Sequence, residues 1–521
     1  MPKRNLSIEE FEDKELEILR DAVDKIQDEQ GRKAMMDDSI KDIITIVEDF
    51  LRKSQCICYG GTAINNLLPI NDQFYNKDVE LPDYDFYSEK PLEHAKELAD
   101  IYYDKGYTEV VAQSGMHAGT FKVFVNFIPV ADITYLPLKL YNKIKKDSQT
   151  RKGIYYCSIN YLRMSMYLEL SRPHGDVSRW PKVLKRLSLF NKHYPLRGKG
   201  CNVDEIQRLF QYGIKKDIIT GGKKKKKDDT PGLLDEDDFI NTIEEKIFTV
   251  VRESLIKQGC VFFGAFANRL YLKTTKNFKN EDIPKIPDFD VLSEDPNGSA
   301  LIIKERLESI GVTNIDIIMH EGIGEVIAPH YEIRVGPESC CFIYEPLACH
   351  SYNVVAGKLG NIRIATLDTM LSFYLAFLYS ARPYYNNDRI TCMSEFLFRV
   401  QEKNRLEQKG LLKRFSMKCY GTQDTKEDIR SEKTKKYEEL KDKRGSKDWE
   451  WYFLRYEPAK KTTEPKKTQK KTIKKTQKKT KKNKKVKRNN KSKKKVKKKV
   501  KKGKKIKNNN KKGKRRKPWF R

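Results

Sequence analysis

Apolar and polar positions follow two different periods along the chain before residue 459, which predicts a mixture of strands and helices. Residues 56–59 form a short apolar run suited to a buried strand, and residues 119–127 alternate apolar and polar side chains like a half-buried strand. Near the N-terminus, Ser7 and Glu10 have capping-box spacing. We expect residues 1–50 to form an amphipathic helical segment that packs on the body, with its apolar face made by Phe11, Leu19, Ala22, Val23 and Ile26.

The two sides of a low-complexity insert resemble each other. The insert, GGKKKKKDDTPG at residues 221–232, has the Gly, Pro and Lys content of an exposed linker. Three blocks on one side are answered on the other: CICYGGTAINNLL (56–68) by CVFFGAFANRLYL (260–272), LPDYDFYSEKP (81–91) by IPDFDVLSEDP (286–296), and PVADITY (129–135) by PLACHSY (346–352). Matched blocks in matched order predict a tandem duplication of one α/β (α+β) unit.

The formal net charge of +33 comes from the C-terminal end. Of the 105 Lys and Arg residues, 35 follow Ala459 with a single acidic residue, so the preceding part has a net charge of −1. Residues 459–521 contain almost nothing apolar, and we expect a disordered basic tail. Such a tail could tether RNA by charge alone, or it could be a dispensable solubilising or packaging extension.

The composition argues against a secreted or membrane-spanning protein. The N-terminus is charged and lacks the apolar region of a signal peptide, and the longest apolar stretch, 370–379, is too short to span a bilayer. Ten cysteines without a CxxC pair indicate reduced, buried thiols, with neither a disulfide framework nor a zinc site. The seven histidines are scattered without metal-ligand spacing, so we expect ordinary surface or core roles for them.

Gly60, Gly61 and Thr62 follow the predicted strand at residues 56–59 and open a helix near Ala63. Glycines allow a triphosphate to approach the backbone amides, while the helix N-terminus and the Thr62 hydroxyl offer contacts to anionic oxygens. Taken alone, Gly-Gly-Thr is weak evidence and is better explained as an ordinary tight turn.

Asp83 and Asp85 stand two residues apart, so on a strand their carboxylates project from the same face. Neighbouring carboxylates repel unless a cation lies between them, and hard oxygen ligands suit Mg²⁺ or Mn²⁺. Asp132 lies in another alternating segment; if its strand lies beside that of Asp83, the three carboxylates can hold two metal ions about 3.5 to 4 Å apart. A lone Asp-x-Asp pair would instead fit a solvated strand end.

The combination of strand, Gly-Gly-Thr turn, helix, Asp-x-Asp and a third Asp resembles the nucleotidyltransferase superfamily that includes DNA polymerase beta. The resemblance implies tandem polymerase-beta-like domains with mixed sheets flanked by helices: a catalytic domain at 51–220, the linker at 221–232 and a second domain at 233–458. It also implies site roles. Asp83, Asp85 and Asp132 would be the catalytic metal ligands, and Gly60, Gly61 and Thr62 would bind the nucleotide.

The second copy departs from this pattern. Where the first copy has Gly61, Thr62 and Asp132, the block matches place Ala265, Phe266 and Cys349. Only the aspartate pair, Asp288 and Asp290, is kept. We therefore expect one working site and one structural or RNA-binding relic, since two active sites would need a further metal ligand that the second copy does not show.

Residues 161–191, with CYGGTAINNLLP and LPDYDFYS, resemble the poly(A) polymerase catalytic subunits of large DNA viruses, including the poxvirus, African swine fever virus and mimivirus-type enzymes. The resemblance implies template-independent addition of AMP from ATP to the 3′ end of mRNA, with two Mg²⁺ or Mn²⁺ ions as cofactors. Two alternatives stay open: another terminal nucleotidyltransferase, forming uridylylated RNA or oligoadenylate, or a non-catalytic RNA-binding scaffold.

Five basic residues in or near that segment are candidates for phosphate or RNA contacts: Arg163, Arg179, Lys182, Lys185 and Arg186. For each one, a solvated helix face is an equally good interpretation.

The partners implied are ATP and an RNA 3′ end, with no membrane. The second domain or a homodimer would supply an RNA path, and the need for a separate processivity subunit stays open. The expected location is intracellular, in the host cytoplasm or viral factory for a viral protein, with packaging in the virion as a further option.

Overall fold

The computed structural model describes residues 38–75, 82–199, 201, 243–272, 288–357, 360–380 and 382–458, and the isolated helical positions Glu15, Ile18, Leu19, Ala22 and Ile26. The expected linker at 221–232 and the tail at 459–521 lie outside the described residues. Leu19 and Ile26 are helical but more than half exposed, so these two side chains do not form the packing face expected of them. Within the described ranges, no helix has both the length and the apolar character to cross a membrane.

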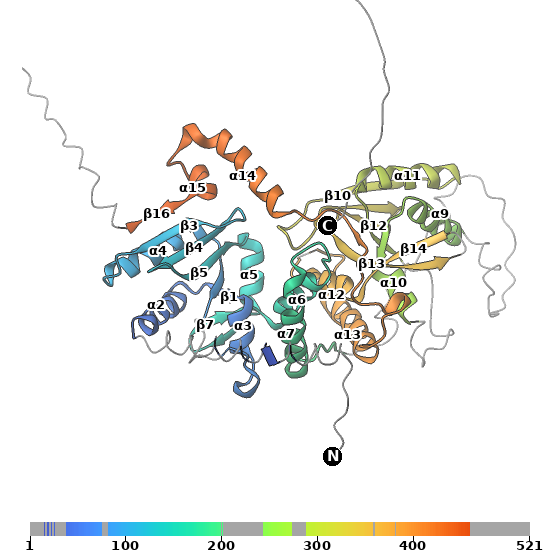
Figure 1. Cartoon of the computed structure of the whole chain (residues 1–521). Helices are drawn as coiled ribbons and strands as arrows, with labels where there is room; N and C mark the ends of the chain where they lie inside the picture. The colour runs from blue at the N-terminus through green and yellow to red at the C-terminus, as the bar shows by residue number, and fades with distance from the viewer. Residues whose placement is uncertain are drawn as a thin grey trace, which may run out of the picture. The chain divides into compact units, whose positions relative to one another are not determined.

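The first half of the chain, with one strand added by residues 455–456, builds an eight-stranded mixed sheet in the order β16-β3-β4-β5-β2-β1-β7-β6 (Figure 1). Its strands are β1 (Ile57–Tyr59), β2 (Tyr84–Ser88), β3 (Val110–Ser114), β4 (Thr120–Val125), β5 (Ile128–Tyr135), β6 (Gln149–Arg151), β7 (Ile154–Tyr156) and β16 (Arg455–Tyr456). Its helices are α2 (Asp38–Ser54), α3 (Gly60–Leu67), α4 (Pro91–Asp104), α5 (Leu138–Lys146), α6 (Ile159–Leu170) and α7 (Trp180–His193), with the short turns η1 (Ile70–Asp72) and η2 (Val177–Arg179).

The second half builds another eight-stranded sheet in the order β10-β11-β12-β9-β8-β14-β13-β15. Its strands are β8 (Val261–Phe263), β9 (Phe289–Leu292), β10 (Ile315–His320), β11 (His330–Val335), β12 (Glu338–Tyr344), β13 (His350–Gly357), β14 (Gly360–Ala365) and β15 (Cys419–Tyr420). Its helices are α9 (Ile243–Lys257), α10 (Gly264–Leu272), α11 (Pro296–Ser309), α12 (Leu367–Phe377) and α13 (Asn387–Lys403), with the turn η6 (Gly410–Leu412). The last described elements are α14 (Lys426–Leu440), η7 (Lys441–Lys443) and α15 (Lys447–Phe453).

The two sheets share one topology. The runs β3-β4-β5-β2-β1-β7 and β10-β11-β12-β9-β8-β14 have the same succession of antiparallel and parallel pairings. In each half, a glycine with a φ of 71° joins a strand to a helix: Gly60 follows β1 and begins α3, and Gly264 follows β8 and begins α10. The predicted α/β (α+β) class, with two mixed sheets flanked by helices, is confirmed.

The strand register corrects the expected counterpart of Asp132. On the parallel strands β2 and β5, Asp85 lies opposite Asp132. On the equivalent strands β9 and β12, Asp290 lies opposite Phe342, whereas Cys349 follows β12 and precedes β13. The match of Asp132 with Cys349 is therefore wrong, and the position of the third carboxylate is occupied by Phe342.

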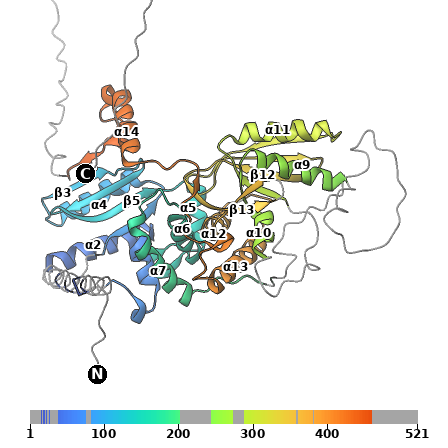
Figure 2. The same ribbon diagram turned by 45° about the vertical axis from the view of Figure 1, so that its right-hand side comes forward.

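The described chain ends in the first domain, not in the second, where the boundary at 458 placed it. β16 pairs with β3 at one edge of the first sheet, and α14 lies beside that sheet in both ribbon views (Figures 1 and 2). Lys96 of α4 forms an ion pair with Glu450 of α15 at 2.8 Å, and the Tyr456 hydroxyl donates to Asp100 at 2.6 Å. Residues 426–456 thus complete the first domain after the chain has left the second.

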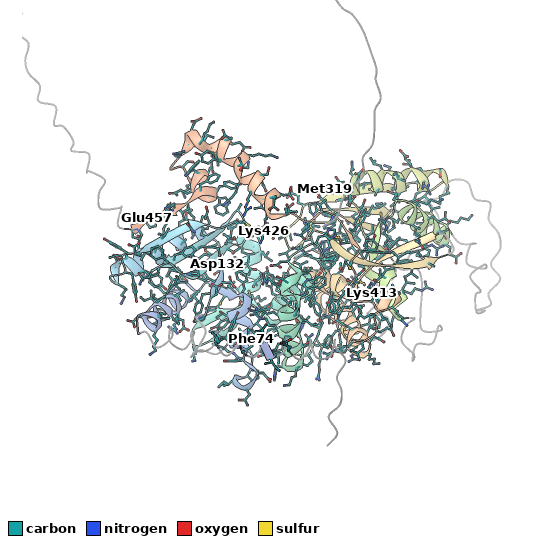
Figure 3. The ribbon with its side chains drawn as sticks, in the orientation of Figure 1. Phe74, Asp132, Met319, Lys413, Lys426 and Glu457 are labelled. Carbon is teal, nitrogen blue, oxygen red and sulfur yellow. A yellow bond between two sulfur atoms is a disulfide. The ribbon has the colours of Figure 1, made fainter. Side chains whose placement is uncertain are left out.

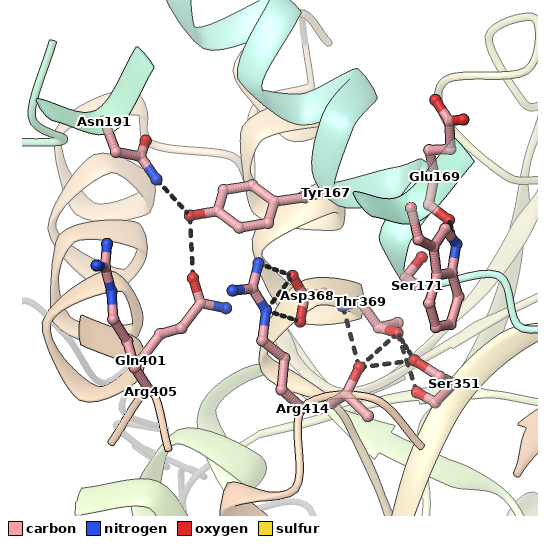
Figure 4. Close-up of polar contacts among 12 residues, drawn as sticks. Tyr167, Glu169, Ser171, Asn191, Ser351, Asp368, Thr369, Gln401, Arg405 and Arg414 are labelled. Atoms are coloured by element: carbon pink, nitrogen blue, oxygen red, sulfur yellow. Dashed lines mark hydrogen bonds and ion pairs between the residues drawn. The ribbon is translucent and has the colours of Figure 1, made fainter. Parts of the chain in front are cut away.

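Two equivalent helices form much of the contact between the halves. α6 and α12 follow the equivalent strands β7 and β14, begin at N-caps Ser158 and Thr366, and pack against each other. Figure 4 shows the polar contacts around them: the Ser351 amide donates to the Ser171 carbonyl at 2.8 Å, and Tyr167 donates to Gln401 at 3.3 Å. Hydrogen bonds of this kind help to specify one packing arrangement of the two halves, although Gln401 Nε2 has no partner among the described residues.

The cysteines also differ from expectation. Six of them are free and buried, as predicted: Cys56, Cys58, Cys157, Cys260, Cys340 and Cys341. The other four form two disulfides, Cys201–Cys392 and Cys349–Cys419. Each disulfide joins residues far apart in the sequence, with separations of 191 and 70 residues, so no local spacing could have revealed it.

Candidate active site

Asp83, Asp85 and Asp132 meet at one edge of the first sheet. Asp83 immediately precedes β2, Asp85 is on β2, and Asp132 is directly opposite Asp85 on the neighbouring parallel strand β5. Figure 3 shows Asp132 within the first sheet. The structure therefore brings together the three carboxylates that strand periodicity and motif order predicted.

Burial and mutual repulsion raise the pKa values of two of these three carboxyl groups. Burial raises the pKa of Asp85 to about 7, and the charges of Asp83 and Asp132 add to the rise, while Lys122 and Arg179 oppose it. The pKa of Asp83 is also raised, by burial first and by the charge of Asp132 second. Carboxylates that resist ionisation in this way need compensating positive charge in order to be used together as anions.

Part of that compensation comes from Lys122, a residue that sequence reasoning missed. Lys122 lies opposite Asp132 on the antiparallel pair β4 and β5, and its ammonium group forms an ion pair with Asp132 Oδ2. The other oxygen, Asp132 Oδ1, is buried and has no hydrogen-bond partner among the residues that the structure describes. A signal for Lys122 existed, because it is the one charged residue within the alternating segment at 119–127.

The Gly-Gly turn allows close approach at two points. A Cβ on Gly60 would overlap Asp85 Oδ2, and a Cβ on Gly61 would overlap the Tyr75 hydroxyl and lie 3.1 Å from Arg186 Nη1. Tyr59, the N-cap residue of α3, supplies no side-chain hydrogen bond to the first turn, so that turn offers its amides to a ligand. The local sequence thus presents backbone amides beside the carboxylates.

Thr62 has a different role from the one expected of it. Its side chain is buried, and its hydroxyl donates to the Asp83 carbonyl oxygen at 2.6 Å. The hydroxyl therefore fixes the backbone that carries the Asp-x-Asp pair.

Among the predicted basic residues, Arg186 lies against the Gly-Gly turn. It is largely buried, donates from Nη2 to the Tyr75 hydroxyl at 2.8 Å, and stacks 4.6 Å from the ring centre of Phe74, which Figure 3 labels. Tyr75 and Phe74 were missed at the sequence level, because nothing in their local pattern connects them with α7.

The other basic candidates divide by exposure. Arg163 is fully buried, and its guanidinium donates to Asn191 at 2.8 Å, to Asn160 at 2.6 Å and to the Tyr194 carbonyl. Burial lowers its pKa to about 10. Arg163 is thus a structural residue here, and the expectation of a phosphate or RNA contact does not fit it.

Arg179, Lys182 and Lys185 remain on the surface of η2 and α7. Arg179 forms an ion pair with Glu169 at 3.0 Å, and Lys182 Nζ lies 6.0 Å from the ring centre of Tyr75. Lys185 lines an open groove between α7 and α13 together with Lys192 and Arg405. The side chains of all three candidates are exposed.

The equivalent edge of the second sheet has lost these features. Phe266, in place of Thr62, lies in an aromatic cluster 5.0 Å from Phe262 and 5.4 Å from Phe289. Phe342, in place of Asp132, is fully buried and lies 4.9 Å from Tyr384. Aromatic rings thus occupy the positions of a hydroxyl and a carboxylate in the first half. The turn glycine is kept, because a Cβ on Gly264 would overlap Asp290 as a Cβ on Gly60 would overlap Asp85.

Comparisons with known proteins point in one direction. Residues 45–176 match the family model of the poly(A) polymerase catalytic subunit. The chain is 34% identical over 163 residues to a putative poly(A) polymerase catalytic subunit of African swine fever virus (strain Badajoz 1971 Vero-adapted), covering 30% of this chain and 34% of that protein. It is 31% identical over 194 residues to the putative poly(A) polymerase catalytic subunit of Acanthamoeba polyphaga mimivirus, covering 35% and 32%.

The chain thus spans about a third of the length of the curated relatives it matches. The fold is similar over a longer range to the crystal structure of the Megavirus polyadenylate synthase, with a TM-score of 0.67, 20% identity, and coverage of 89% of this chain and 90% of that one. The resemblance expected from the sequence is confirmed for residues 45–176, the region that contains the three carboxylates and the Gly-Gly turn.

Proposed function

We propose that the chain is a poly(A) polymerase that adds AMP from ATP to the 3′ end of mRNA without a template. The observation that carries the proposal is the pairing of Asp85 with Asp132 on adjacent parallel strands, with Asp83 beside them, inside the region that matches the poly(A) polymerase catalytic subunit model. Enzymes of the nucleotidyltransferase superfamily transfer nucleotides to many different acceptors. The three carboxylates therefore support the reaction type, and the matched relatives support the choice of substrate.

The residues present fit a pair of hard divalent cations. Three carboxylates converge, the pKa of Asp85 is raised to about 7 by burial and by its acidic neighbours, and Asp132 Oδ1 is buried without a hydrogen-bond partner among the described residues. Oxygen-only ligands suit Mg²⁺ or Mn²⁺. When bound, the two ions would activate the attacking hydroxyl and neutralise charge on the triphosphate.

The chain's own residues would then position the reactants. Asp83, Asp85 and Asp132 hold the ions, the Thr62 hydroxyl fixes the Asp83 backbone, and the amides after Gly60 face the triphosphate. The buried guanidinium of Arg186, held against Gly61 and Tyr75, is placed to bind a phosphate oxygen. Lys122 neutralises Asp132 in the metal-free protein and would release it when a cation arrives.

The second domain is proposed to be non-catalytic. A buried Phe342 in the position of the third carboxylate and a buried Phe266 beside the turn leave an aspartate pair without the further ligand that two ions need. Its remaining roles are to cover the first domain and to border the RNA path.

We place the protein inside infected cells, with ATP and an RNA 3′ end as partners; its relatives are viral proteins. A homodimer or the second domain would extend the RNA path. The name of the relatives, catalytic subunit, is compatible with a separate partner subunit.

Primer extension tests the proposed function. Full-length protein is incubated with a radiolabelled RNA primer, Mg²⁺ or Mn²⁺, and each ribonucleoside triphosphate separately, and Asp83→Asn serves as the inactive control. Long products with ATP alone are expected. Extension with UTP would indicate a uridylyltransferase, short 2′,5′-linked products would indicate an oligoadenylate synthetase, and no extension with any triphosphate would leave an RNA-binding scaffold.

A further inference from the structure

One imidazole and two sulfur atoms gather away from the carboxylate edge. His174 Nδ1, Cys349 Sγ and Cys419 Sγ all lie within 4.8 Å of one another. His174 follows α6 of the first domain, while Cys349 precedes β13 and Cys419 is on β15 of the second. The cluster therefore joins the two domains, and none of its members has a role in the proposed reaction.

Backbone contacts hold these three residues in place. Ser351 pairs with Cys419 across β13 and β15, and the Ser351 amide donates to the Ser171 carbonyl at 2.8 Å, three residues before His174. Gly421 has a φ of 94°, and a Cβ there would lie 2.5 Å from the Ala348 carbonyl oxygen. The strand that carries Cys419 thus runs tightly against the segment that carries Cys349.

We propose that, once reduced, this cluster is a Zn²⁺ site that fastens the turn after α6 to the second domain. The Cys349–Cys419 disulfide is reduced by a low-molecular-weight thiol: two electrons and two protons convert the S–S bond into two thiols, and the reductant leaves as its own disulfide. Binding of Zn²⁺ then displaces the two thiol protons. Two thiolates, one neutral imidazole and one divalent cation give a site without net charge, which a half-buried position tolerates.

The donor types and one nitrogen-to-sulfur distance fit this metal, whereas the two sulfur atoms, bonded to each other in the disulfide, must separate on reduction to reach tetrahedral positions. Zn²⁺ takes thiolate sulfur at about 2.3 Å and imidazole nitrogen at about 2.0 to 2.1 Å in a tetrahedral arrangement, which puts sulfur and nitrogen about 3.6 Å apart. Cys419 Sγ and His174 Nδ1 are 3.6 Å apart. Sulfur and nitrogen donors without a carboxylate select Zn²⁺ over Mg²⁺ and Mn²⁺, and the exposed side of His174 leaves a fourth position for water.

The other cysteines favour the reduced form. Six thiols remain free in the described part of the chain, which is the usage of a protein that works where thiols stay reduced. The second disulfide, Cys201–Cys392, provides a contrast. Cys201 Sγ lies 3.7 Å from Glu395 Oε2, and within the described ranges no histidine joins that pair to complete a ligand group.

Metal analysis of the full-length protein tests the site. Wild-type protein and the variants Cys419→Ser, His174→Ala and Cys392→Ser are purified with a phosphine reductant, passed over a chelating resin and analysed for zinc by mass spectrometry. About one zinc per chain is expected in wild type and Cys392→Ser, none in Cys419→Ser, and at least tenfold weaker binding in His174→Ala. His174 is exposed, so this last change does not endanger folding.

Cobalt substitution provides a second, spectroscopic readout. Co²⁺ added to reduced wild-type protein should give a near-ultraviolet sulfur-to-cobalt charge-transfer band, and Zn²⁺ should abolish it. Asp132→Asn should keep both the band and the zinc, which separates this site from the carboxylate edge. Zinc content equal in wild type and Cys419→Ser, loss of zinc in Cys392→Ser, or no charge-transfer band in wild type would each overturn the proposal.

Discussion

The two sheets of this protein share a run of six strands with the same pairing and the same turn glycine, yet they differ at the position that faces the second aspartate of the pair. In the first, Asp132 stands opposite Asp85, and in the second Phe342 stands opposite Asp290. The same strand pairing thus accommodates an ion-paired carboxylate in one sheet and a buried aromatic ring in the other. The comparison teaches that this fold does not need the third carboxylate, in agreement with the metal-binding role that we propose for Asp132.

The turn glycines support this separation. Gly60 and Gly264 both have a φ of 71°, and in both a Cβ would overlap the second aspartate of the pair. The second domain thus keeps the aspartate pair and its glycine as a structural unit, whereas its Thr62 and Asp132 equivalents have become phenylalanines.

Introducing a carboxylate at the position of Phe342 should destabilise the second domain rather than create a metal site. Phe342→Asp places a charge among aromatic side chains in a fully buried position. We expect a loss of at least about 3 to 5 kcal/mol of unfolding free energy, the cost of emptying a buried Phe position. Urea unfolding at pH 8 measures it, with Phe342→Leu as the matched control at about 1 kcal/mol. A Phe342→Asp variant as stable as wild type would contradict the apolar filling described here.

Removing the third carboxylate in the first domain should abolish activity without unfolding. Asp132→Asn is expected to lower the rate of AMP addition by more than about 100-fold, because a direct metal ligand should matter more than a group that only orients one. Phe342→Leu at the equivalent position should stay within about twofold of wild type. Comparable losses in the two variants would mean that the second domain takes part in the reaction.

The two turn glycines should have equal structural and unequal functional effects. Gly60→Ala and Gly264→Ala should each lose about 1 to 3 kcal/mol of stability, because each forces a Cβ into the left-handed region and against a carboxylate. Gly60→Ala alone should also reduce the rate, since it displaces Asp85. Thermal unfolding and primer extension on the same samples give both quantities, and a rate loss in Gly264→Ala would count against the assignment.

Metal affinity should depend on pH through Asp85. Its pKa of about 7 in the metal-free protein means that protons compete with the metal below pH 7. The affinity for Mn²⁺ should be about tenfold weaker at pH 6 than at pH 8 for one displaced proton. The folded protein holds the Asp85 proton more tightly than the unfolded chain does. The contribution of this carboxyl to the unfolding free energy of the metal-free protein therefore falls as the pH rises from about 4 to 7. Mn²⁺ titration followed by electron paramagnetic resonance checks it, and Asp290→Asn should leave the pH dependence unchanged.

The exposed lysines of α7 should have the smallest effect. If Lys182 or Lys185 contacts one RNA phosphate, its replacement by Ala should reduce the slope of log affinity against log salt by about 0.7. The rate at saturating RNA should not change. Filter binding at several salt concentrations measures the slope. Lys105→Ala, at the residue that caps the C-terminal end of α4, is the control. An identical slope in all variants would mean that Lys182 and Lys185 do not contact RNA.

Much of the site could be predicted because strand geometry is simple. Side chains two residues apart on a strand project from the same face, which predicted that the carboxylates of Asp83 and Asp85 lie together. The alternating segment before Asp132 predicted a neighbouring strand. The fold class followed from matched blocks in matched order. These inferences needed only local periods and the order of motifs.

The failures concern contacts between distant segments. Cys349 was matched to Asp132 because PLACHSY resembles PVADITY, but it lies beyond β12, and only strand register identifies Phe342. The sequence suggested that Arg163 is available to phosphate or RNA, but in the structure α7 covers it and Asn191 accepts its hydrogen bond. The two-residue strand β16, which brings the end of the described chain back to the first sheet, is too short to leave a periodic signal.

The most direct test of the central claim compares equivalent aspartates in one assay. Asp85→Asn and Asp290→Asn each remove the second aspartate of a pair, and both side chains lie against a turn glycine. The rate of AMP addition to an RNA primer, measured at saturating ATP and Mn²⁺, should fall by more than about 100-fold in Asp85→Asn and stay within about twofold of wild type in Asp290→Asn. Equal losses in both variants, or full activity in Asp85→Asn, would contradict the account of one working site and one that has kept only its fold.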